Sequence, residues 1–170
     1  MKEAQSIAMD QEYRIRLATP IDHQSILDCQ RAAIATVPAG YYPPQALKAW
    51  WEAPACGMFD LILARRYYVA ELGGRIVAGG GWEAWPNSPD TATVRAVFVH
   101  PAHAKHGLGR LIVDAAEDAA VTQGFIRFLA PAAYNATGFY RRLGYAAAEL
   151  AMDVINGQRL GYCRMWKQAA

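Results

Sequence analysis

The segment from Val94 to Ala120 most constrains what this chain can fold into, because it reads as a strand, a glycine-containing turn and a helix in close succession. The apolar β-type run ends at His100-Pro101, and a polar turn follows as far as Gly109. Apolar residues then recur at helical spacing, at Leu108, Leu111, Ile112, Ala115, Ala116 and Ala119. Such a unit presents free backbone N–H groups and the positive end of a helix. The segment therefore predicts a site for a phosphorylated cofactor.

The turn itself reads Ala104-Lys105-His106-Gly107-Leu108-Gly109. It resembles the acetyl-CoA-binding motif of the GNAT superfamily of N-acetyltransferases, which is written Gln/Arg-x-x-Gly-x-Gly/Ala between a strand and a helix. Both glycines are present, and alanine replaces the leading Gln/Arg. The resemblance implies that main-chain N–H groups of this turn bind the pyrophosphate of acetyl-CoA. Lys105, His106 and Arg110 are the side chains that can supply the missing charge.

A second segment, Asn135-Ala136-Thr137-Gly138-Phe139-Tyr140-Arg141-Arg142-Leu143-Gly144-Tyr145, resembles the family's N-A-x-x-F-Y-x-x-L-G-F/Y pattern. The run 14–20 with Asp22 is similar to the family's first strand and helix cap. The resemblance extends from about Tyr13 to Lys167, with the elements in the family's order. We therefore expect one GNAT-like domain over residues 13–167, between a flexible tail at 1–12 and a short tail at 168–170.

The composition predicts a globular cytoplasmic protein. With 54% apolar and 19% charged residues among 170, the chain can bury a substantial core. A net charge of +2 gives no support to nucleic-acid or membrane binding. Cys29, Cys56 and Cys163 are far apart and read as reduced thiols rather than metal ligands. Residues 1–11 do not read as a signal peptide, and no apolar run approaches the ~18 residues of a membrane span.

Local patterns predict a mixed α+β fold, the α/β architecture of GNAT-like acyl-CoA N-acyltransferases. Expected strands cover 14–18, 67–72, 75–82, 94–99, 125–130, 146–154 and 160–167. Expected helices begin at Asp22 and at Pro43-Pro44 and cover 108–122 and 136–142. Gly73-Gly74 and Asn156-Gly157 indicate tight hairpins. The sheet is expected to be largely antiparallel and flanked by helices.

The resemblance implies that strands 94–99 and 125–130 run parallel and splay apart, with the pantetheine arm of acetyl-CoA between them. Main-chain groups of Val97, Phe98 and Val99 would bind the arm, and one N–H would stabilise the oxyanion. The same residues also suit a plain core, and both interpretations can hold. The glycine run at 79–81 predicts a bulge or a close approach of a ligand, or simply a permissive entry into a loop.

Acetyl transfer to an amine needs a neutral nucleophile, a stabilised oxyanion and a proton for the leaving thiolate. Tyr140 matches the position of the family's general acid, although it is also one of nine tyrosines that can pack under a sheet. Asn135 is predicted to bind the pantetheine amide, or to serve as a turn or helix cap.

The general base is the open assignment. Glu83 follows the glycine run and is the best-placed carboxylate, whereas Glu71 abuts a hairpin turn; Glu83 also fits a solvated strand end. His100, His103 and His106 recur at a spacing that fits no metal site, and no fourth ligand is evident. We therefore expect no metal.

An aromatic wall is predicted on the acceptor side of the site, and core packing is the alternative interpretation of the same residues. These residues are Tyr41, Tyr42, Trp50, Trp51, Trp82 and Trp85.

The leading hypothesis is an acetyl-CoA-dependent N-acetyltransferase acting on a small-molecule amine, with peptide amines as a second acceptor class. A non-catalytic acyl-CoA-binding module is the alternative. A dinucleotide-binding fold is excluded because the Gly-x-Gly lies late in the chain and lacks a third glycine. Either a monomer or a homodimer fits the sequence.

Overall fold

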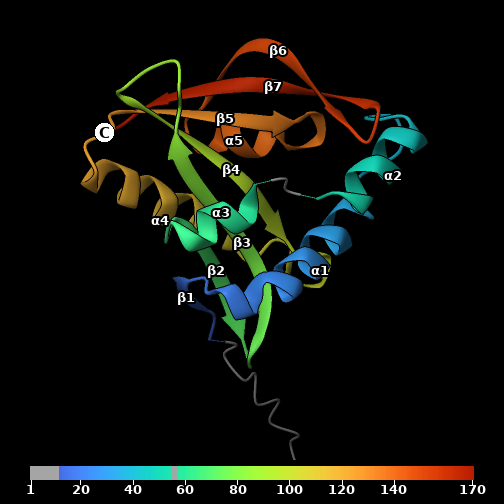
Figure 1. The fold of residues 1–170 in the computed structure, drawn as a ribbon, viewed down its shortest axis with the longest axis horizontal. Helices are drawn as coiled ribbons and strands as arrows, with labels where there is room; N and C mark the ends of the chain where they lie inside the picture. Colours follow the sequence, from blue (N-terminus) through green and yellow to red (C-terminus); the bar gives the residue numbers. More distant parts are fainter. Residues whose placement is uncertain (1–11, 55–56) are drawn as a thin grey trace, which may run out of the picture.

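A computed structural model describes residues 12–54 and 57–170 as a seven-stranded sheet with helices on both faces (Figure 1). The strand order is β1-β2-β3-β4-β5-β7-β6, and every neighbouring pair is antiparallel except β4 and β5. The strands are β1 (Arg14–Leu17), β2 (Tyr67–Leu72), β3 (Arg75–Ala84), β4 (Thr91–Val99), β5 (Arg127–Ala133), β6 (Ala146–Ile155) and β7 (Gln158–Gln168). The mixed α/β architecture predicted from the sequence is confirmed.

The helices are α1 (His23–Ile34), α2 (Pro44–Glu52), α3 (Met58–Leu63), α4 (Leu108–Thr122) and α5 (Thr137–Arg142). Short 3-10 turns cover Pro20–Asp22, Pro101–His103 and Tyr134–Ala136. In Figure 1, α1, α2 and α3 lie on the near side of the sheet, and α4 and α5 on the far side. Separate apolar clusters fill the two faces, so each face has its own core.

Both predicted hairpins are confirmed. Gly73 and Gly74 have φ of +55° and +80°, and Asn156 and Gly157 have φ of +47° and +76°. Two consecutive left-handed residues give the turn whose twist matches that of the flanking strands. These local signals therefore place β2 against β3 and β6 against β7.

The start of β5 was predicted two residues too early. Gly124, at φ +93°, closes α4, and the N–H of Phe125 donates to the carbonyl of Ala120 at 3.1 Å. Phe125 thus belongs to the helix cap, and the strand runs from Arg127 through Pro131 to Ala133. At the other end of the chain, β7 reaches Gln168, one residue past the domain boundary expected at 167.

Helix α3 was not predicted: no helix was expected between the one that begins at Pro43-Pro44 and the strand at 67–72. Its buried residues Met58, Leu61 and Ile62 pack with Tyr67 and Val69 of β2. Six residues are too few for a clear periodic pattern, so only the tertiary contact marks the helix.

The side chain of Asp22 does not cap α1 as predicted, although the residue holds the N-cap position. Its carboxylate accepts hydrogen bonds from the Arg16 guanidinium at 2.7 and 2.9 Å and from the N–H of Thr19 at 2.8 Å. The hydrogen bond from Arg16 is the main reason that the pKa of Asp22 falls to about 2. The carboxylate therefore ties β1 to the start of α1.

We expect Asp22→Asn to lower the free energy of unfolding by about 2 kcal/mol at pH 7. Because the pKa of Asp22 is lower in the folded state, its contribution is present above its unfolded pKa of 3.8 and is lost as pH falls toward 2. Urea denaturation at pH 7, 4 and 2.5 measures this, and the difference between variant and parent should shrink over that range. A difference that stays constant with pH would contradict the prediction.

Candidate active site

Strands β4 and β5 separate after a short parallel contact. Their pairing covers only Thr91 with Arg127, Ala92 with Phe128, and Thr93 with Leu129. Beyond that point β5 pairs only with β7, as far as Ala133. A cavity of about 610 Å³ lies where the strands part, with Thr93 and residues 95–99 of β4 along one wall. The splay predicted from the sequence is therefore confirmed.

A β-bulge in β4 lies at the wall of this cleft. Between the pairs Gly79–Phe98 and Gly81–Arg95, β4 contains one residue more than β3. Ala96 takes up the excess with a φ of +54°, a strained conformation for a residue that carries a Cβ. The predicted bulge is thus present beside the glycine run, but the extra residue belongs to β4.

Two glycines of the run, Gly79 and Gly81, make room for the ring of Tyr67, whereas Gly80 faces Val97 and Ile112. A Cβ on Gly79 would lie 2.8 Å from the Tyr67 ring, and one on Gly81 would lie 2.9 Å from it. The buried Tyr67 hydroxyl donates to the carbonyl of Ala96 at 2.8 Å and accepts from the Gln30 amide at 3.3 Å. The close approach predicted at these glycines is therefore made by a side chain that holds the bulge.

The turn before α4 leaves backbone donors open. Lys105 and Gly107 have φ of +64° and +75°, and no side chain caps the helix. The first N–H groups of a helix, here from Leu108 to Arg110, have no carbonyl four residues earlier to bind. A Cβ on Gly109 would lie 3.0 Å from the Phe139 ring, so glycine lets the helix start approach α5 closely. Because Phe139 also lines the cleft, this contact places the turn next to the cleft.

The side chains of this turn differ in availability. Ala104, Lys105 and His106 are exposed, and the His106 ring nitrogen lies 3.1 Å from the carbonyl of His103. Exposed Arg110 pairs with Asp114 at 3.6 Å. Leu108 is only 1% exposed and packs in the core, so only its main chain is open to a ligand. The turn thus offers N–H donors with exposed cationic side chains around them.

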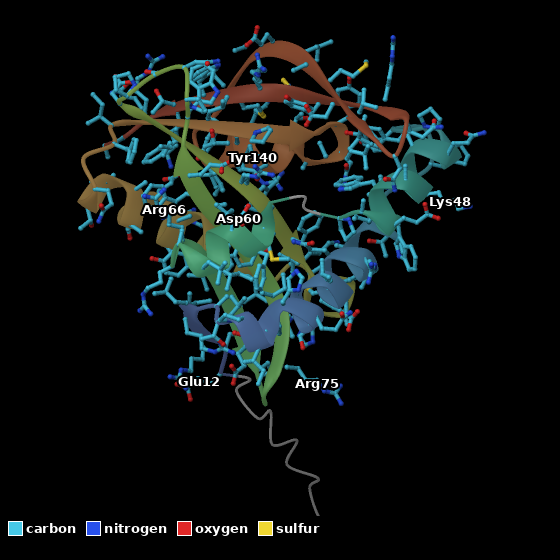
Figure 2. All side chains as sticks on the ribbon, viewed as in Figure 1. Glu12, Lys48, Asp60, Arg66, Arg75 and Tyr140 are labelled. Carbon is cyan, nitrogen blue, oxygen red and sulfur yellow. The ribbon has the colours of Figure 1, made fainter. Side chains whose placement is uncertain are left out.

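Tyr140 lies near the centre of the molecule (Figure 2) and lines the cleft from α5. Its ring meets Phe139 and Tyr145 edge-on, at centroid distances of 5.0 and 5.4 Å. Burial raises the pKa of the Tyr140 hydroxyl well above its usual range, and the charge of Glu117 adds to this effect. The hydroxyl therefore stays protonated at neutral pH and can donate a proton.

A largely buried ion pair holds Tyr145, whose ring packs against that of Tyr140. The carboxylate of Glu117, on α4, accepts from the Tyr145 hydroxyl at 2.7 Å and from the Lys167 ammonium at 2.6 Å. Burial also raises the pKa of Tyr145. This cluster was not predicted from the sequence, although Glu117 falls on the apolar face of α4 at helical spacing from Val113 and Ala120.

Asn135 lines the cleft from the 3-10 turn after β5, close to where Val97, Phe98, Val99 and Tyr140 also line it. These five predicted site residues are brought together.

Glu83, the predicted base, is not among the described residues that line the cleft. Its carboxylate binds the Arg95 guanidinium at 2.6 Å, and it is Arg95 that reaches the cleft. Glu71 is likewise held, by Arg16 at 2.7 Å. No group of three or more histidine, cysteine, aspartate or glutamate side chains able to hold a metal occurs within residues 12–54 and 57–170.

The predicted aromatic wall is only partly present. Tyr42 and Trp50 line the cleft. Trp82 instead lies in the core on the α4 side, beneath the guanidinium of Arg66, and Trp51 is exposed. The lining residues of β6 and β7, among them Asp153 and Tyr162, were not predicted from the sequence.

Comparison with known families and structures identifies this architecture. The model of the Acetyltransferase (GNAT) family matches residues 31–145. The chain belongs to the GNAT acetyltransferase family. The resemblance carried by the two motifs is thereby confirmed, and both motifs lie within the matched residues of this GNAT chain. No curated protein sequence matches the chain significantly.

Solved structures agree with the assignment. The GCN5-related N-acetyltransferase of Rhodopseudomonas palustris is 25% identical, with a TM-score of 0.79 over 94% of this chain and 98% of that one. PaiA N-acetyltransferase of Thermoplasma acidophilum, in complex with coenzyme A, is 15% identical over 92% and 99%, with a TM-score of 0.73. YncA of Salmonella typhimurium, a putative acetyltransferase with acetyl-CoA, is 22% identical over 93% and 94%, with a TM-score of 0.63. The last two show a shared fold.

Helices long and apolar enough to cross a membrane are absent from the described part of this GNAT chain. Cys29 and Cys163 are buried free thiols, and Cys56 lies outside the described residues.

We expect Glu117→Gln to lower the free energy of unfolding by about 2 kcal/mol, because the largely buried Lys167 ammonium loses its counter-charge. Asp114→Asn is the matched control on the same helix, since its ion pair with Arg110 is exposed and contributes little. Urea denaturation at pH 7 compares the two. Equal losses would show that α4 responds to charge in general rather than to the buried cluster.

Proposed function

We propose that this GNAT protein transfers an acetyl group from acetyl-CoA to a primary amine of a small molecule. The observation that carries the proposal is the cleft between β4 and β5, which has an uncapped helix N-terminus beside it and a buried, protonated tyrosine in its wall. Membership of the family and solved neighbours with coenzyme A or acetyl-CoA support it.

In this proposal the pyrophosphate of acetyl-CoA binds the open N–H groups from Leu108 to Arg110. Lys105 and His106 add nearby donors and charge, which compensates for Ala104. The pantetheine arm pairs with the main chain of Val97 to Val99 on β4, and Asn135 faces it from the other wall.

Chemistry then requires the neutral amine to attack the thioester carbonyl, forming the N–C bond as the C–S bond breaks. A main-chain N–H at the bulge stabilises the oxyanion. Tyr140 donates its proton to the departing thiolate and regains one from the released amine proton through solvent. Glu83 is held by Arg95, so the role that fits it is to position Arg95 at the cleft wall.

We expect Tyr140→Phe to lower kcat about a hundredfold while leaving the Kd for acetyl-CoA within about twofold, because the ring keeps its packing and only the proton donor is lost. Thiol release from acetyl-CoA with a pooled amine panel measures turnover, and calorimetry measures binding. Tyr41→Phe, at an exposed tyrosine outside the cleft lining, is the matched control.

Unchanged turnover in Tyr140→Phe would contradict the general-acid role. Tight binding of acetyl-CoA by the parent protein with no amine-dependent release would favour the non-catalytic acyl-CoA-binding module. Failure to bind acetyl-CoA would overturn the proposal as a whole.

A further inference from the structure

The part of the cleft that faces α1 and α2 has an aromatic wall. Trp50 lies between Tyr42 and Phe98, at ring-centroid distances of 6.0 and 6.1 Å. Ile34, Val37 and Leu160 complete this apolar surface. Tyr42 is fixed in place because its hydroxyl donates to the carbonyl of Gly161 at 2.8 Å and accepts from the N–H of Tyr134 at 2.9 Å. The wall therefore contains one ring held by two hydrogen bonds, and it is suited to a flat or branched apolar group.

The charges at the same cleft favour a cation. Of the described residues that line it, Arg95 and Asp153 carry charge at neutral pH. The Arg95 charge is balanced by Glu83 at 2.6 Å. Asp153 is exposed near the end of β6, opposite Leu160 of the apolar wall, and makes no ion pair within the described residues. The net charge contributed to the cleft is therefore negative, which attracts an ammonium group and repels a carboxylate.

We propose that the acceptor is a primary amine on an aromatic or branched apolar group without a carboxylate. It binds as the ammonium ion near Asp153, with its apolar group against the wall of Tyr42, Trp50 and Phe98. Loss of one proton to solvent then gives the neutral amine that attacks the thioester. This inference rests on the proposed function, because it assigns the acceptor of the same cleft.

The test compares four probes at pH 8: 2-phenylethylamine, propylamine, L-phenylalanine and spermidine. We expect kcat/KM for 2-phenylethylamine to exceed that for each of the others by about tenfold or more, since a buried ring contributes about that much and a buried unpaired carboxylate costs as much. A higher kcat/KM for L-phenylalanine or spermidine would overturn the inference and leave the proposed function standing.

Two variants separate the ring contact from the charge. Trp50→Ala should raise KM for 2-phenylethylamine about tenfold and KM for propylamine about twofold or less. Trp51→Ala, at the exposed neighbour on α2, should change neither. Asp153→Asn should raise KM for both amines, whereas Asp118→Asn, at an exposed carboxylate on α4, should not. Equal effects of Trp50→Ala on both amines, or none from Asp153→Asn, would overturn the assignment.

Calorimetry separates failure of this inference from failure of the proposed function. If acetyl-CoA does not bind, both fall. If acetyl-CoA binds and no probe is acetylated, 2-phenylethylamine is titrated into the coenzyme A-bound protein. No binding overturns the acceptor assignment, and binding that Trp50→Ala abolishes supports it.

A different observation concerns the bulge itself. The peptide bond between Ala96 and Val97 is trans, as are all those described, so its N–H points opposite to its carbonyl. The carbonyl is held by the buried Tyr67 hydroxyl at 2.8 Å, with Gln30 behind it. The N–H of Val97 therefore points away from Tyr67, and Val97 lines the cleft.

We infer that Tyr67 is a positioning residue for acetyl transfer: by holding the Ala96 carbonyl, it fixes the direction of the Val97 N–H that stabilises the oxyanion. This inference also rests on the proposed function. A small rotation of one donor is enough to lower the rate, because oxyanion stabilisation depends on preorganised geometry.

Tyr67→Phe is expected to lower kcat about tenfold, with KM and the Kd for acetyl-CoA within about twofold of the parent. Tyr68→Phe is the matched control, because the next residue of β2 makes no hydrogen bond through its hydroxyl within the described residues. Thermal melting of both variants, with the parent, establishes that they are folded at the assay temperature. A folded Tyr67→Phe with unchanged kcat, or a loss of acetyl-CoA binding that matches the loss of turnover, would overturn the positioning role.

Discussion

The early end of the parallel pairing between β4 and β5 is the constraint on which the rest of the site depends. After Thr93 the two strands are no longer paired. The edge of β4 that faces β5 therefore has no strand partner where the cleft lies. A sheet loses main-chain pairing at such a split, which is stable only if packing on both faces holds the halves together. Here α4 and α5 on one face and α1 and α2 on the other supply that packing.

Two ion pairs position the polar groups near the point where β4 and β5 separate, and within each pair the two charges neutralise each other. Glu117 takes the charge of Lys167 beneath Tyr140, and Glu83 takes that of Arg95 at the cleft wall. Each pair fixes a neighbouring group without leaving a buried charge uncompensated. This arrangement leaves Tyr140 neutral, and Asp153 lines the cleft without an ion pair to any described residue.

Much of the fold could be predicted from the sequence because its signals are local. Asn156-Gly157 specifies a hairpin since both residues tolerate positive φ, and the helical spacing after Leu108 specifies α4. Tyr140 and the Gly107-x-Gly109 turn were located by their resemblance to the family's motifs. The structure places Tyr140 in the cleft lining and brings Gly109 against Phe139, which also lines the cleft. Three consecutive glycines at 79–81 are unusual in a strand and require a structural explanation. The sequence did not identify the group that approaches them.

The sequence by itself determined the order of the strands and of every helix but α3, the hairpin turns and the motifs, because each depends on residues within a few positions of one another. Tertiary structure alone decided that the glycines receive the Tyr67 ring, that Glu83 is engaged by Arg95, and that β6 brings Asp153 to the cleft. These outcomes depend on contacts between residues 12 or more positions apart in the chain. Such contacts follow from strand register and helix packing, which no local pattern encodes.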